Sequence, residues 1–398
     1  MTDPLVGRHV TLGVTGSIAC YKAVDLASKL VQAGAMVDVI MTDGAQEFLW
    51  PITFSSITHR PVVTNLFDPQ SELSMDHVAL AKRSDVVLVA PATADAIAKA
   101  AWGMAGDALS ATLLATEAPV IFAPAMDANM YDNPATQENV SKLRSRGAVI
   151  AGPAEGRLAS GLVGRGRMLE PSALVDHVRI VLGRDGDLSG KKIVVSAGGT
   201  QEPIDPVRMI TNRSSGKMGF AIAEAARDRG ANAVIVSAPT ALPDPTGITV
   251  VHVETALEMR DAVTAQCEDA DALIMAAAVA DWRSAEVASQ KLKKGSAETM
   301  TIEMVKNPDI VAGIGGGRMV KVGFAAESED VVENAQSKLL SKGLDIIAAN
   351  DITSADSGFA TDTNRVVLLD RDGGVTELGL LSKYEVGHRI LDKVVQML

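Results

Sequence analysis

The sequence predicts an α/β protein built from two doubly wound domains with mostly parallel sheets. Three observations predict this class: continuous apolar runs of strand length, helical apolar patterns between them, and a strand, glycine turn and helix at the start of each half. Apolar strands that alternate with helices are typical of a parallel sheet covered on both faces. A chain of 398 residues is long enough for two or three domains, and we expect two.

The first half opens with a strand at His9 to Val14, the turn Gly16-Ser17, and a helical apolar pattern from Ile18 to Leu30. Three more strands are expected in this half, at Met36 to Met41, Val86 to Ala90 and Val120 to Ala123. These elements form the first predicted sheet.

The segment Gly183 to Gly190 has a composition that solvates the backbone and cannot bury apolar area, with three glycines, two aspartates and a serine. We place the domain boundary there, with domains at 1–182 and 191–398 and a linker at 183–190. The second domain is expected to contain strands at Lys192 to Ala197, Ala233 to Ser237, Ala272 to Ala276, Val320 to Phe324 and Ile346 to Ala349, and helices at Met218 to Arg229, Ser328 to Lys342 and the C-terminus.

The bulk composition limits the classes of partner. A net charge of −12 argues against nucleic-acid and anionic-membrane partners, which need clustered lysine and arginine. The two cysteines, Cys20 and Cys267, have no metal-ligand spacing, which indicates core thiols in a reducing compartment. No run approaches the ~20 apolar residues of a membrane span, and the first residues lack a signal-peptide pattern, so we expect a cytoplasmic protein.

Polar and glycine residues follow the strands of the first half where a parallel sheet binds ligands. Gly16-Ser17 stands where N–H groups at a helix start attract phosphate, although a purely structural turn fits the same residues. Pro91-Ala-Thr-Ala-Asp95 is a Thr/Asp cluster that suits helix capping and, through its backbone, ligand contact. Asp76-His77 can serve proton transfer, and a surface histidine at a helix start is the alternative.

Four motifs of the first half resemble the FMN-dependent cysteine decarboxylases, the homo-oligomeric flavoproteins that include phosphopantothenoylcysteine decarboxylases. They are GVTGSIACYK at 13–22, DHVALAKRSDVVLVAPATAD at 76–95, PAMDANMYDNPATQ at 124–137 and LASGLVGRGRM at 158–168. The resemblance implies a flavodoxin-like flavoprotein half that assembles on trimers. It also implies that His77 is catalytic and that the flavin contacts are Gly16, Ser17, Thr42, Pro91, Ala92 and Thr93.

Two residues depart from this family's pattern. Asp127 stands where relatives usually have the asparagine that binds the substrate carboxylate, and our hypothesis is that Asp127 is protonated or bonded to another substrate group. Ser160 stands where many relatives have the cysteine that donates the last proton, and a hydroxyl is a far weaker acid than a thiol. Cys20 is expected to be buried packing rather than a substitute donor. The loop Ser160 to Gly166 is expected to be a mobile flap over the substrate.

Three segments of the second half carry chemistry-bearing residues. Ser196 to Thr200 is a glycine turn directly after a strand, and Asn212 to Met218 combines an amide, two hydroxyls and two cations before a helix. The latter is not a P-loop, since the spacing of glycine is wrong. Lys291-Leu-Lys-Lys294 is a compact positive cluster. Solvated loops and a solvated charge run are the alternatives.

Together these segments resemble phosphopantothenate–cysteine ligases, through SAGGTQEPIDPVRMITNRSSGKMGFAIA, AAAVADWR, KLKK, MVKNPDIV, VGFAAE and AANDI. The resemblance implies a Rossmann-like ligase half that forms dimers and uses CTP with Mg²⁺ or Mn²⁺. Asn212 is then expected to hold an acyl-cytidylate and Lys291 to offset charge on the phosphates. The implied nucleotide contacts are Met275, Ala276, Ala277, Asp281, Asn307, Pro308, Asp309, Ile310, Phe324, Lys338 and Lys342.

The two resemblances imply a bifunctional enzyme of coenzyme A synthesis. Its second half would join 4′-phosphopantothenate to cysteine, and its first half would decarboxylate the product to 4′-phosphopantetheine. Three alternatives stay open: a slow or altered flavoprotein half beside an active ligase, a non-catalytic flavoprotein regulator, and an NAD-dependent dehydrogenase. An incomplete G-x-G-x-x-G pattern disfavours the last of these.

Overall fold

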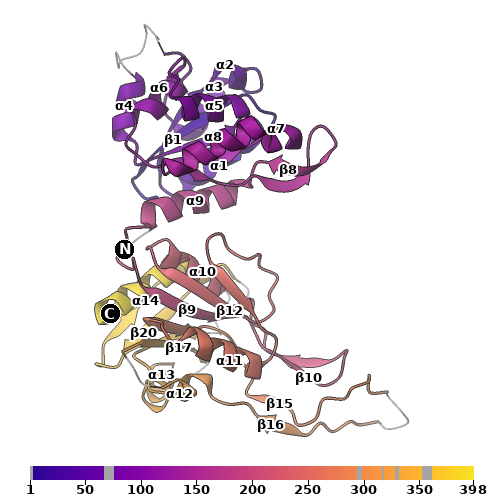
Figure 1. Cartoon of the computed structure of the whole chain (residues 1–398). Coiled ribbons are helices and arrows are strands. Elements are labelled where there is room, and N and C mark those ends of the chain that lie inside the picture. Colours follow the sequence, from indigo (N-terminus) through magenta and orange to yellow (C-terminus); the bar gives the residue numbers. More distant parts are fainter. Residues whose placement is uncertain (1–2, 67–75, 294–297, 316–317, 328–330, 352–360) are drawn as a thin grey trace. The chain divides into compact units, whose positions relative to one another are not determined.

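The computed structural model describes residues 3–66, 76–293, 298–315, 318–327, 331–351 and 361–398. These residues form two compact units, Pro4–Leu182 and Gly183–Leu398, and the N-terminal Asp3 belongs to the second of them (Figure 1). Within the described ranges, no helix is both long enough and apolar enough to cross a membrane.

The first unit contains a six-stranded parallel sheet in the order β3-β2-β1-β4-β5-β6. This is the Rossmann strand order, whereas flavodoxin itself has the order 2-1-3-4-5; the sequence analysis implied a flavodoxin-like half and gave no strand order. The expected α/β class and doubly wound sheet are confirmed. The strands are β1 (His9–Val14), β2 (Met36–Met41), β3 (Val62–Val63), β4 (Val86–Ala92), β5 (Val120–Pro124) and β6 (Val149–Ile150).

Helices cover both faces of this sheet. Buried side chains of α1, α3 and α9 form one apolar cluster on the sheet, and those of α4 to α8 form the other. The helices are α1 (Cys20–Gln32), α2 (Asp43–Gln46), α3 (Pro51–Thr58), α4 (Asp76–Arg83), α5 (Ala94–Trp102), α6 (Ala108–Ala115), α7 (Ala128–Asp132), α8 (Pro134–Ser145) and α9 (Pro171–Gly183). Between α8 and α9, β7 (Ala154–Arg157) and β8 (Val163–Arg167) pair as an antiparallel hairpin.

The second unit contains an eight-stranded mixed sheet in the order β13-β12-β9-β14-β17-β18-β20-β21, antiparallel only at β20 and β21. Its six parallel strands follow the same 3-2-1-4-5-6 order as the first sheet. The strands are β9 (Lys192–Ala197), β12 (Asn232–Ser237), β13 (Thr249–His252), β14 (Ala272–Met275), β17 (Val320–Glu327), β18 (Ile346–Asp351), β20 (Val366–Asp370) and β21 (Val375–Glu377).

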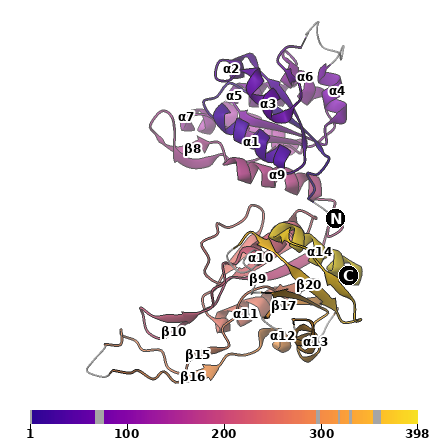
Figure 2. The ribbon, with the colours of Figure 1, turned by 180° about the vertical axis from the view of Figure 1, so that it is seen from behind.

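The second sheet is also covered on both faces, by α10 and α14 on one side and by α11, α12 and α13 on the other. The helices are α10 (Lys217–Arg227), α11 (Ala256–Gln266), α12 (Ile310–Gly313), α13 (Val331–Ser341) and α14 (Lys383–Met397). Two hairpins, β10 (Gln201–Pro203) with β11 (Met209–Thr211) and β15 (Trp282–Ser284) with β16 (Met304–Lys306), form an arm that extends away from this sheet (Figures 1 and 2). A short pair, β19 (Thr363–Asn364) with β22 (Leu381–Ser382), precedes α14.

The segment at 183–190 packs on the second unit. Leu188 is fully buried in that unit's core, and Arg229 forms two bonds to Asp187, of 2.9 and 2.6 Å. A side chain at Gly183 would meet the Asp228 carbonyl oxygen at 1.9 Å, so only glycine fits there. The expectation that this segment buries no apolar side chain is therefore wrong.

The helix α14 carries a buried histidine. Both ring nitrogens of His388 lack a hydrogen-bond partner within the described part of the chain, and its ring lies edge-on to Tyr384 at 4.6 Å. Burial, together with the positive charge of Arg229, lowers the pKa of His388 to about 4. The imidazole is therefore neutral in the folded protein at neutral pH.

Protonation of His388 is expected to destabilise the second unit in acid. The unfolded chain takes up a proton near pH 6.5 that the folded protein takes up only near pH 4. The free energy of unfolding should therefore be highest above pH 6.5 and fall by about 3 kcal/mol as the pH drops to about 4. Urea titrations at several pH values check this. The fall should be smaller in a His388→Phe variant, and an equal fall in both proteins would contradict the assignment.

Candidate active sites

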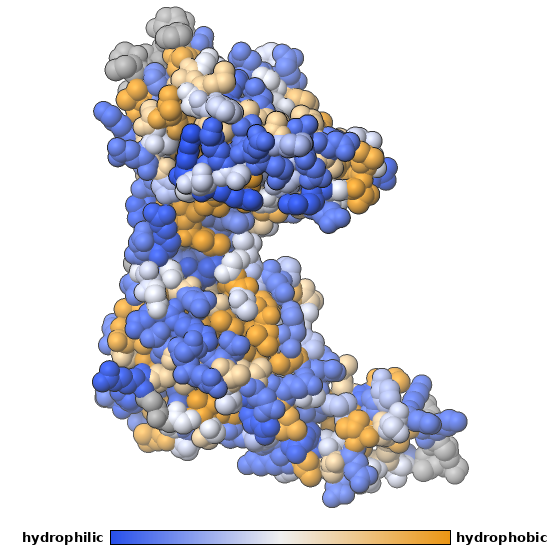
Figure 3. Space-filling view, in the orientation of Figure 1, coloured by the Kyte–Doolittle hydropathy of each residue, from blue (hydrophilic) through white to orange (hydrophobic). Residues whose placement is uncertain are grey.

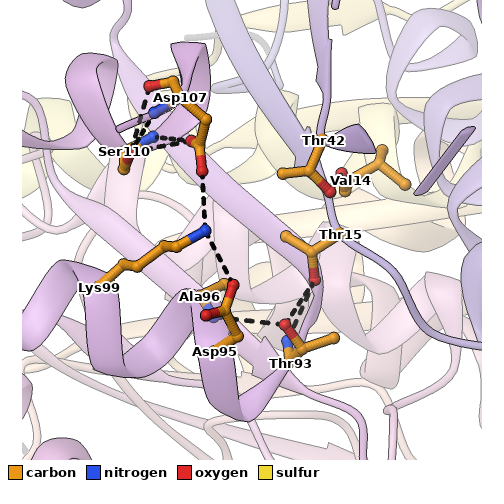
Figure 4. A network of polar contacts seen from close by, with 9 residues as sticks. All are labelled: Val14, Thr15, Thr42, Thr93, Asp95, Ala96, Lys99, Asp107 and Ser110. Carbon is orange, nitrogen blue, oxygen red and sulfur yellow. Dashed lines mark hydrogen bonds and ion pairs between the residues drawn. The ribbon is translucent and has the colours of Figure 1, made fainter. Parts of the chain in front are cut away.

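The first candidate site lies where strand order reverses, between β1 and β4. The buried hydroxyl of Thr15 donates to the Pro91 carbonyl oxygen at 2.7 Å and accepts from the Thr93 N–H at 3.1 Å. Thr93 in turn caps α5, because its hydroxyl accepts from the Ala96 N–H (Figure 4). The ends of both strands are thus fixed relative to each other at the point where parallel sheets bind ligands.

Gly16 lets two loops of this site approach closely. A side chain at Gly16 would meet the backbone of Gly44 at 2.9 Å, a distance that real side chains do not tolerate. Gly44 lies in α2. This helix begins directly after Thr42, the residue that follows β2. The glycine of the β1–α1 turn is therefore required by packing, and its backbone is also exposed to the cavity described next.

Two adjoining lobes form a cavity at this edge of the sheet. The larger lobe, of about 630 Å³, lies between the start of α1, the start of α7 and the β7–β8 hairpin, and the smaller, of about 370 Å³, reaches Thr42 and α6. Gly16 and Thr93 line both lobes, Ser17 lines the larger and Thr42 the smaller. Residues at the starts of α1 and α5 line this space, and helix starts suit a ligand with a phosphate group.

The smaller lobe contains a charged network. Lys99 contacts Asp95 at 3.0 Å and Asp107 at 3.1 Å, and these carboxylates raise its pKa (Figure 4). Asp107 also caps α6 through Ser110. The ammonium group of Lys99 and the carboxylates of Asp95 and Asp107 are therefore held in place by one another on the wall of the lobe.

The two residues that depart from the family pattern contact each other. The Ser160 hydroxyl donates to the Asp127 carboxylate at 2.6 Å, and the other oxygen of Asp127 accepts from the Asn129 N–H at 3.0 Å. The bond from Ser160 has the larger effect and the bond from the Asn129 N–H the smaller, and both lower the pKa of Asp127. This favours the ionised form and disfavours the protonated alternative, while a bond to another substrate group stays a prediction.

The stem of the β7–β8 hairpin is joined to the segment before α7. The Met126 N–H donates to the Gly166 carbonyl oxygen at 3.0 Å, and a side chain at Gly166 would meet the Met126 oxygen at 2.2 Å. The expected flap at Ser160 to Gly166 is therefore the tip and second strand of a hairpin. Its mobility stays a prediction.

His77 does not lie at this cavity. It stands on α4, whereas Asp127 immediately precedes α7 and Ser160 lies at the tip of the hairpin, and both α7 and the hairpin are at the other end of the unit (Figures 1 and 2). Its Nδ1 is buried without a hydrogen-bond partner among the described residues. The side chain of Asp76 lies outside the described part of the structure. Pro91 and Ala92 are buried at the end of β4 and line neither lobe.

Cys20 is a core residue, as expected. Its side chain is fully buried, its thiol lies 3.1 Å from the Thr15 carbonyl oxygen, and burial raises its pKa. A proton donor for chemistry needs a lower pKa and access to the ligand, so Cys20 does not replace Ser160.

The second candidate site lies where strand order reverses between β9 and β14. The Ala277 N–H donates to the Ser196 hydroxyl at 3.1 Å, and the Ala280 N–H donates to Thr200 at 2.9 Å. The Asn212 side chain donates to the Ala278 carbonyl oxygen at 3.2 Å. Residues 276–280 are thus held by the glycine turn after β9 and by Asn212.

A cavity of about 400 Å³, the β14–β17 cavity, opens on one side of residues 276–280. Ten of the eleven expected nucleotide contacts line it: Met275, Ala277, Asp281, Asn307, Pro308, Asp309, Ile310, Phe324, Lys338 and Lys342. They come from four separate segments of the chain, at 275–281, 307–310, 324 and 338–342.

Two of these residues hold the cavity wall together. Asn307 is buried, its amide donates to the Ala280 carbonyl oxygen at 2.8 Å, and its oxygen accepts from Arg283 at 3.0 Å. Asp309 caps α12 and contacts the ammonium of Lys342 at 3.2 Å. Lys338 and Lys342, four residues apart, both reach this cavity, which suits the binding of a polyphosphate.

A second cavity, the α10 cavity of about 150 Å³, opens on the other side of residues 276–280 and includes the remaining contact, Ala276. Ser214, Ser215, Gly216 and Lys217 line it at the start of α10, opposite Lys383. Burial and the neighbouring Lys217 lower the pKa of Lys383 to about 8. Sequence reasoning missed Lys383, because a lysine at a helix start carries no signal of burial.

Lys291 lies outside both of these cavities, in an exposed segment after the hairpin strand β15. The next residue, Leu292, is bound on both sides: its N–H donates to Asp205 at 3.0 Å and its carbonyl oxygen accepts from Arg208 at 2.6 Å. Sequence reasoning missed Asp205. Lys294, also part of the predicted positive cluster, lies outside the described residues.

Across the described part of the chain, no group of three or more His, Cys, Asp or Glu side chains gathers as a metal site would require.

Comparison with protein families matches residues 2–183 to the Flavoprotein family and residues 188–398 to the DNA/pantothenate metabolism flavoprotein C-terminal domain.

Full-length relatives match both halves. The chain is 48% identical to a Coenzyme A biosynthesis bifunctional protein CoaBC from Vibrio parahaemolyticus, over 99% of each chain. It is 46% identical to the protein of that name from Escherichia coli K12, over 98% of this chain and 97% of that one.

Solved structures match each half separately. The C-terminal domain of a Coenzyme A biosynthesis bifunctional protein CoaBC is 41% identical, with a TM-score of 0.46, over 53% of this chain and 97% of that one. The FMN-dependent cysteine decarboxylase SpaF is 31% identical, with a TM-score of 0.38, over 44% of this chain and 99% of that one.

These matches confirm the family expected from the motifs and the expected function in coenzyme A synthesis. The Flavoprotein match over residues 2–183 supports a flavin in the first half. The chain therefore belongs to the family of bifunctional coenzyme A biosynthesis proteins, in which one polypeptide carries a flavin-dependent decarboxylase and a phosphopantothenate–cysteine ligase.

Proposed function

We propose that residues 191–398 join 4′-phosphopantothenate to cysteine with CTP, and that residues 1–182 decarboxylate the resulting 4′-phosphopantothenoylcysteine with FMN. The observation that carries the proposal is the gathering of ten expected nucleotide contacts, from four segments, around the β14–β17 cavity. The two-lobed cavity with Gly16, Ser17, Thr42 and Thr93 on its walls supports the flavin half of the proposal.

In the ligase half, the substrate carboxylate attacks the α-phosphate of CTP to give an acyl-cytidylate and pyrophosphate. The cysteine amine then displaces CMP and forms the amide. Lys338 and Lys342 bind the phosphates in the β14–β17 cavity. Lys291, which lies outside both cavities in the structure, would offset the charge that develops on those phosphates. Asn212 holds the acyl-cytidylate beside Ala278, to which its amide is already bonded. Mg²⁺ or Mn²⁺ enters as the complex with the triphosphate, as is usual for nucleotide substrates.

In the decarboxylase half, a bound FMN would accept a hydride from the substrate and later return it, which would make the loss of CO₂ possible. Gly16, Ser17 and Thr93 would hold the group, and Thr15 fixes the position of Thr93. Thr42 borders the smaller lobe. The hairpin tip at Ser160 limits the entry of water to the larger lobe while it is bonded to Asp127.

His77 would serve a neighbouring subunit's cavity, since it stands at the other end of its own unit from Asp127.

We propose trimers of the first unit and dimers of the second. Large apolar side chains exposed on the first unit support such contacts, among them Tyr21, Trp50 and Ile52. On the arm of the second unit, Val207, Met209 and Trp282 are also exposed, and Figure 3 shows apolar side chains on that arm.

Product analysis tests the proposal. The purified protein is incubated with 4′-phosphopantothenate, cysteine, Mg²⁺ and either CTP or ATP, and the products are followed by mass. We expect 4′-phosphopantetheine with CTP and a bound flavin released as FMN on denaturation. Amide without loss of CO₂ would support the alternative of a slow or altered flavoprotein half. If neither the amide nor 4′-phosphopantetheine forms, the result would favour a non-catalytic regulator. A bound nicotinamide cofactor in place of FMN would favour the dehydrogenase alternative.

A further inference from the structure

Four charged side chains line the larger lobe of the first unit: Lys22, Asp127, Arg157 and Arg167. Two of the cations are neutralised inside the protein. The buried ammonium of Lys22 contacts the Met168 carbonyl oxygen at 3.1 Å and Glu170 at 2.8 Å. Arg167 contacts the same Glu170 carboxylate at 2.9 Å. Neither Lys22 nor Arg167 is therefore available to a ligand without breaking an ion pair.

Arg157 is different. It ends β7, three residues before Ser160, and its side chain is exposed at the lobe. Among the described residues, its guanidinium forms no hydrogen bond, ion pair or ring contact. Arg157 and Asp127 also form no ion pair with each other, although they line the same lobe.

Asp127 makes a carboxylate ligand costly unless a cation accompanies it. Its own oxygens are bonded to Ser160 and Asn129, and these bonds favour the ionised form. A second carboxylate in this lobe would therefore lie near a like charge. A guanidinium offsets that repulsion best, because its planar N–H groups bind both oxygens of a carboxylate.

We propose that Arg157 binds the carboxylate of the decarboxylase substrate, and that Asp127 positions the hairpin tip through Ser160 instead of binding that carboxylate. The inference rests on the proposed function of the first unit. It moves recognition of the acid from the start of α7 to the hairpin. The carboxylate is then held by the same element that covers the lobe.

A pair of ligands that differ only in the carboxylate tests this. The FMN-loaded protein is titrated with 4′-phosphopantothenoylcysteine and with 4′-phosphopantetheine, under conditions that prevent turnover for the first, and Kd is measured by calorimetry. Both ligands carry the same phosphate. We expect Arg157→Gln to raise the Kd of the acid about 10- to 100-fold, as loss of a charged hydrogen-bond pair implies, and to leave the Kd of 4′-phosphopantetheine within about 2-fold.

Three further variants sharpen the test. Arg157→Lys keeps the charge and should recover part of the affinity for the acid. Arg165→Gln is the matched control, since Arg165 lies on the partner strand, over the Tyr131 ring at 5.4 Å, and does not line the lobe. Asp127→Asn removes the like charge but keeps an acceptor for Ser160, so it should lower the Kd of the acid.

An unchanged Kd of the acid in Arg157→Gln overturns the proposal. An equal loss for both ligands also overturns it, because the guanidinium would then bind the phosphate. Failure of the proposed function gives a different result: the wild-type protein would then bind neither ligand, and no CO₂ would be released in a turnover assay.

Discussion

Replacing Gly16 with valine is expected to give a protein that purifies without flavin and keeps its ligase activity. Any side chain at Gly16 meets the Gly44 backbone at 2.9 Å, so the two loops must separate. Those loops carry the N–H groups at the start of α1 and the end of β2, both of which border the cavity. We expect the affinity for FMN to fall at least about 100-fold, since both phosphate and ring contacts depend on this approach.

The measurement is the flavin absorbance per chain, followed by an FMN titration of the stripped protein. Gly106→Val is the matched control, because a side chain there meets no atom within 4 Å. Amide formation from 4′-phosphopantothenate and cysteine reports whether the second unit is intact. A Gly16→Val protein that binds FMN as tightly as the wild type would place the flavin elsewhere.

The fold was predictable because it follows from local patterns. The bounds of β1, β2 and β9 agree with the sequence prediction, since continuous apolar runs ended by glycine or a polar residue define buried strands. The first helix begins at Cys20 rather than Ile18, because the Cys20 N–H bonds to the Ser17 carbonyl oxygen in a turn that precedes the helix. Such ends depend on single hydrogen bonds, which apolar periodicity does not report.

The strand order and the hairpins could not be predicted from the sequence. The order of the first sheet depends on which strands pair, and hydrophobic runs carry no information on pairing. The two strands of the β7–β8 hairpin and the arm strand β11 are short and bury no apolar side chain, so they lack the alternation of a half-buried strand. The same absence of an apolar signal concealed Leu188, a single buried residue within a polar segment.

For the candidate sites, the sequence motifs identified the residues that line the cavities. They did not identify the residues that fix the surrounding segments in position. The nucleotide contacts recur as short motifs, and ten of them meet at one cavity. The carboxylate of Asp205 and the ammonium of Lys383 act through contacts across distant segments, which a linear pattern does not encode. The contact between Asp127 and Ser160 likewise became evident only in three dimensions.

Asp205→Asn is expected to lower kcat of the ligase about 100-fold, the loss typical of a displaced catalytic group, with no effect on the decarboxylase. One oxygen of Asp205 accepts from the N–H groups of Val207 and Arg208, and the other accepts from the Leu292 N–H and from the Arg208 guanidinium. Burial alone would raise the pKa of Asp205, but these bonds outweigh it and hold the pKa well below its usual range. The group is therefore a carboxylate at every pH at which the enzyme is assayed.

An asparagine can serve only one of these two sets of donors, because its amide nitrogen cannot accept. If the oxygen keeps the Val207 and Arg208 N–H groups, the amide nitrogen faces the Leu292 N–H and the guanidinium, and the segment that carries Lys291 loses its anchor. Single-turnover kinetics separates formation of the acyl-cytidylate, which should slow, from binding of CTP, which should not. Asp244→Asn is the control, since Asp244 is an exposed carboxylate whose one partner among the described residues is the surface residue His252. A normal rate in Asp205→Asn, beside an inactive Lys291→Gln, would mean that Lys291 reaches the phosphates without this anchor.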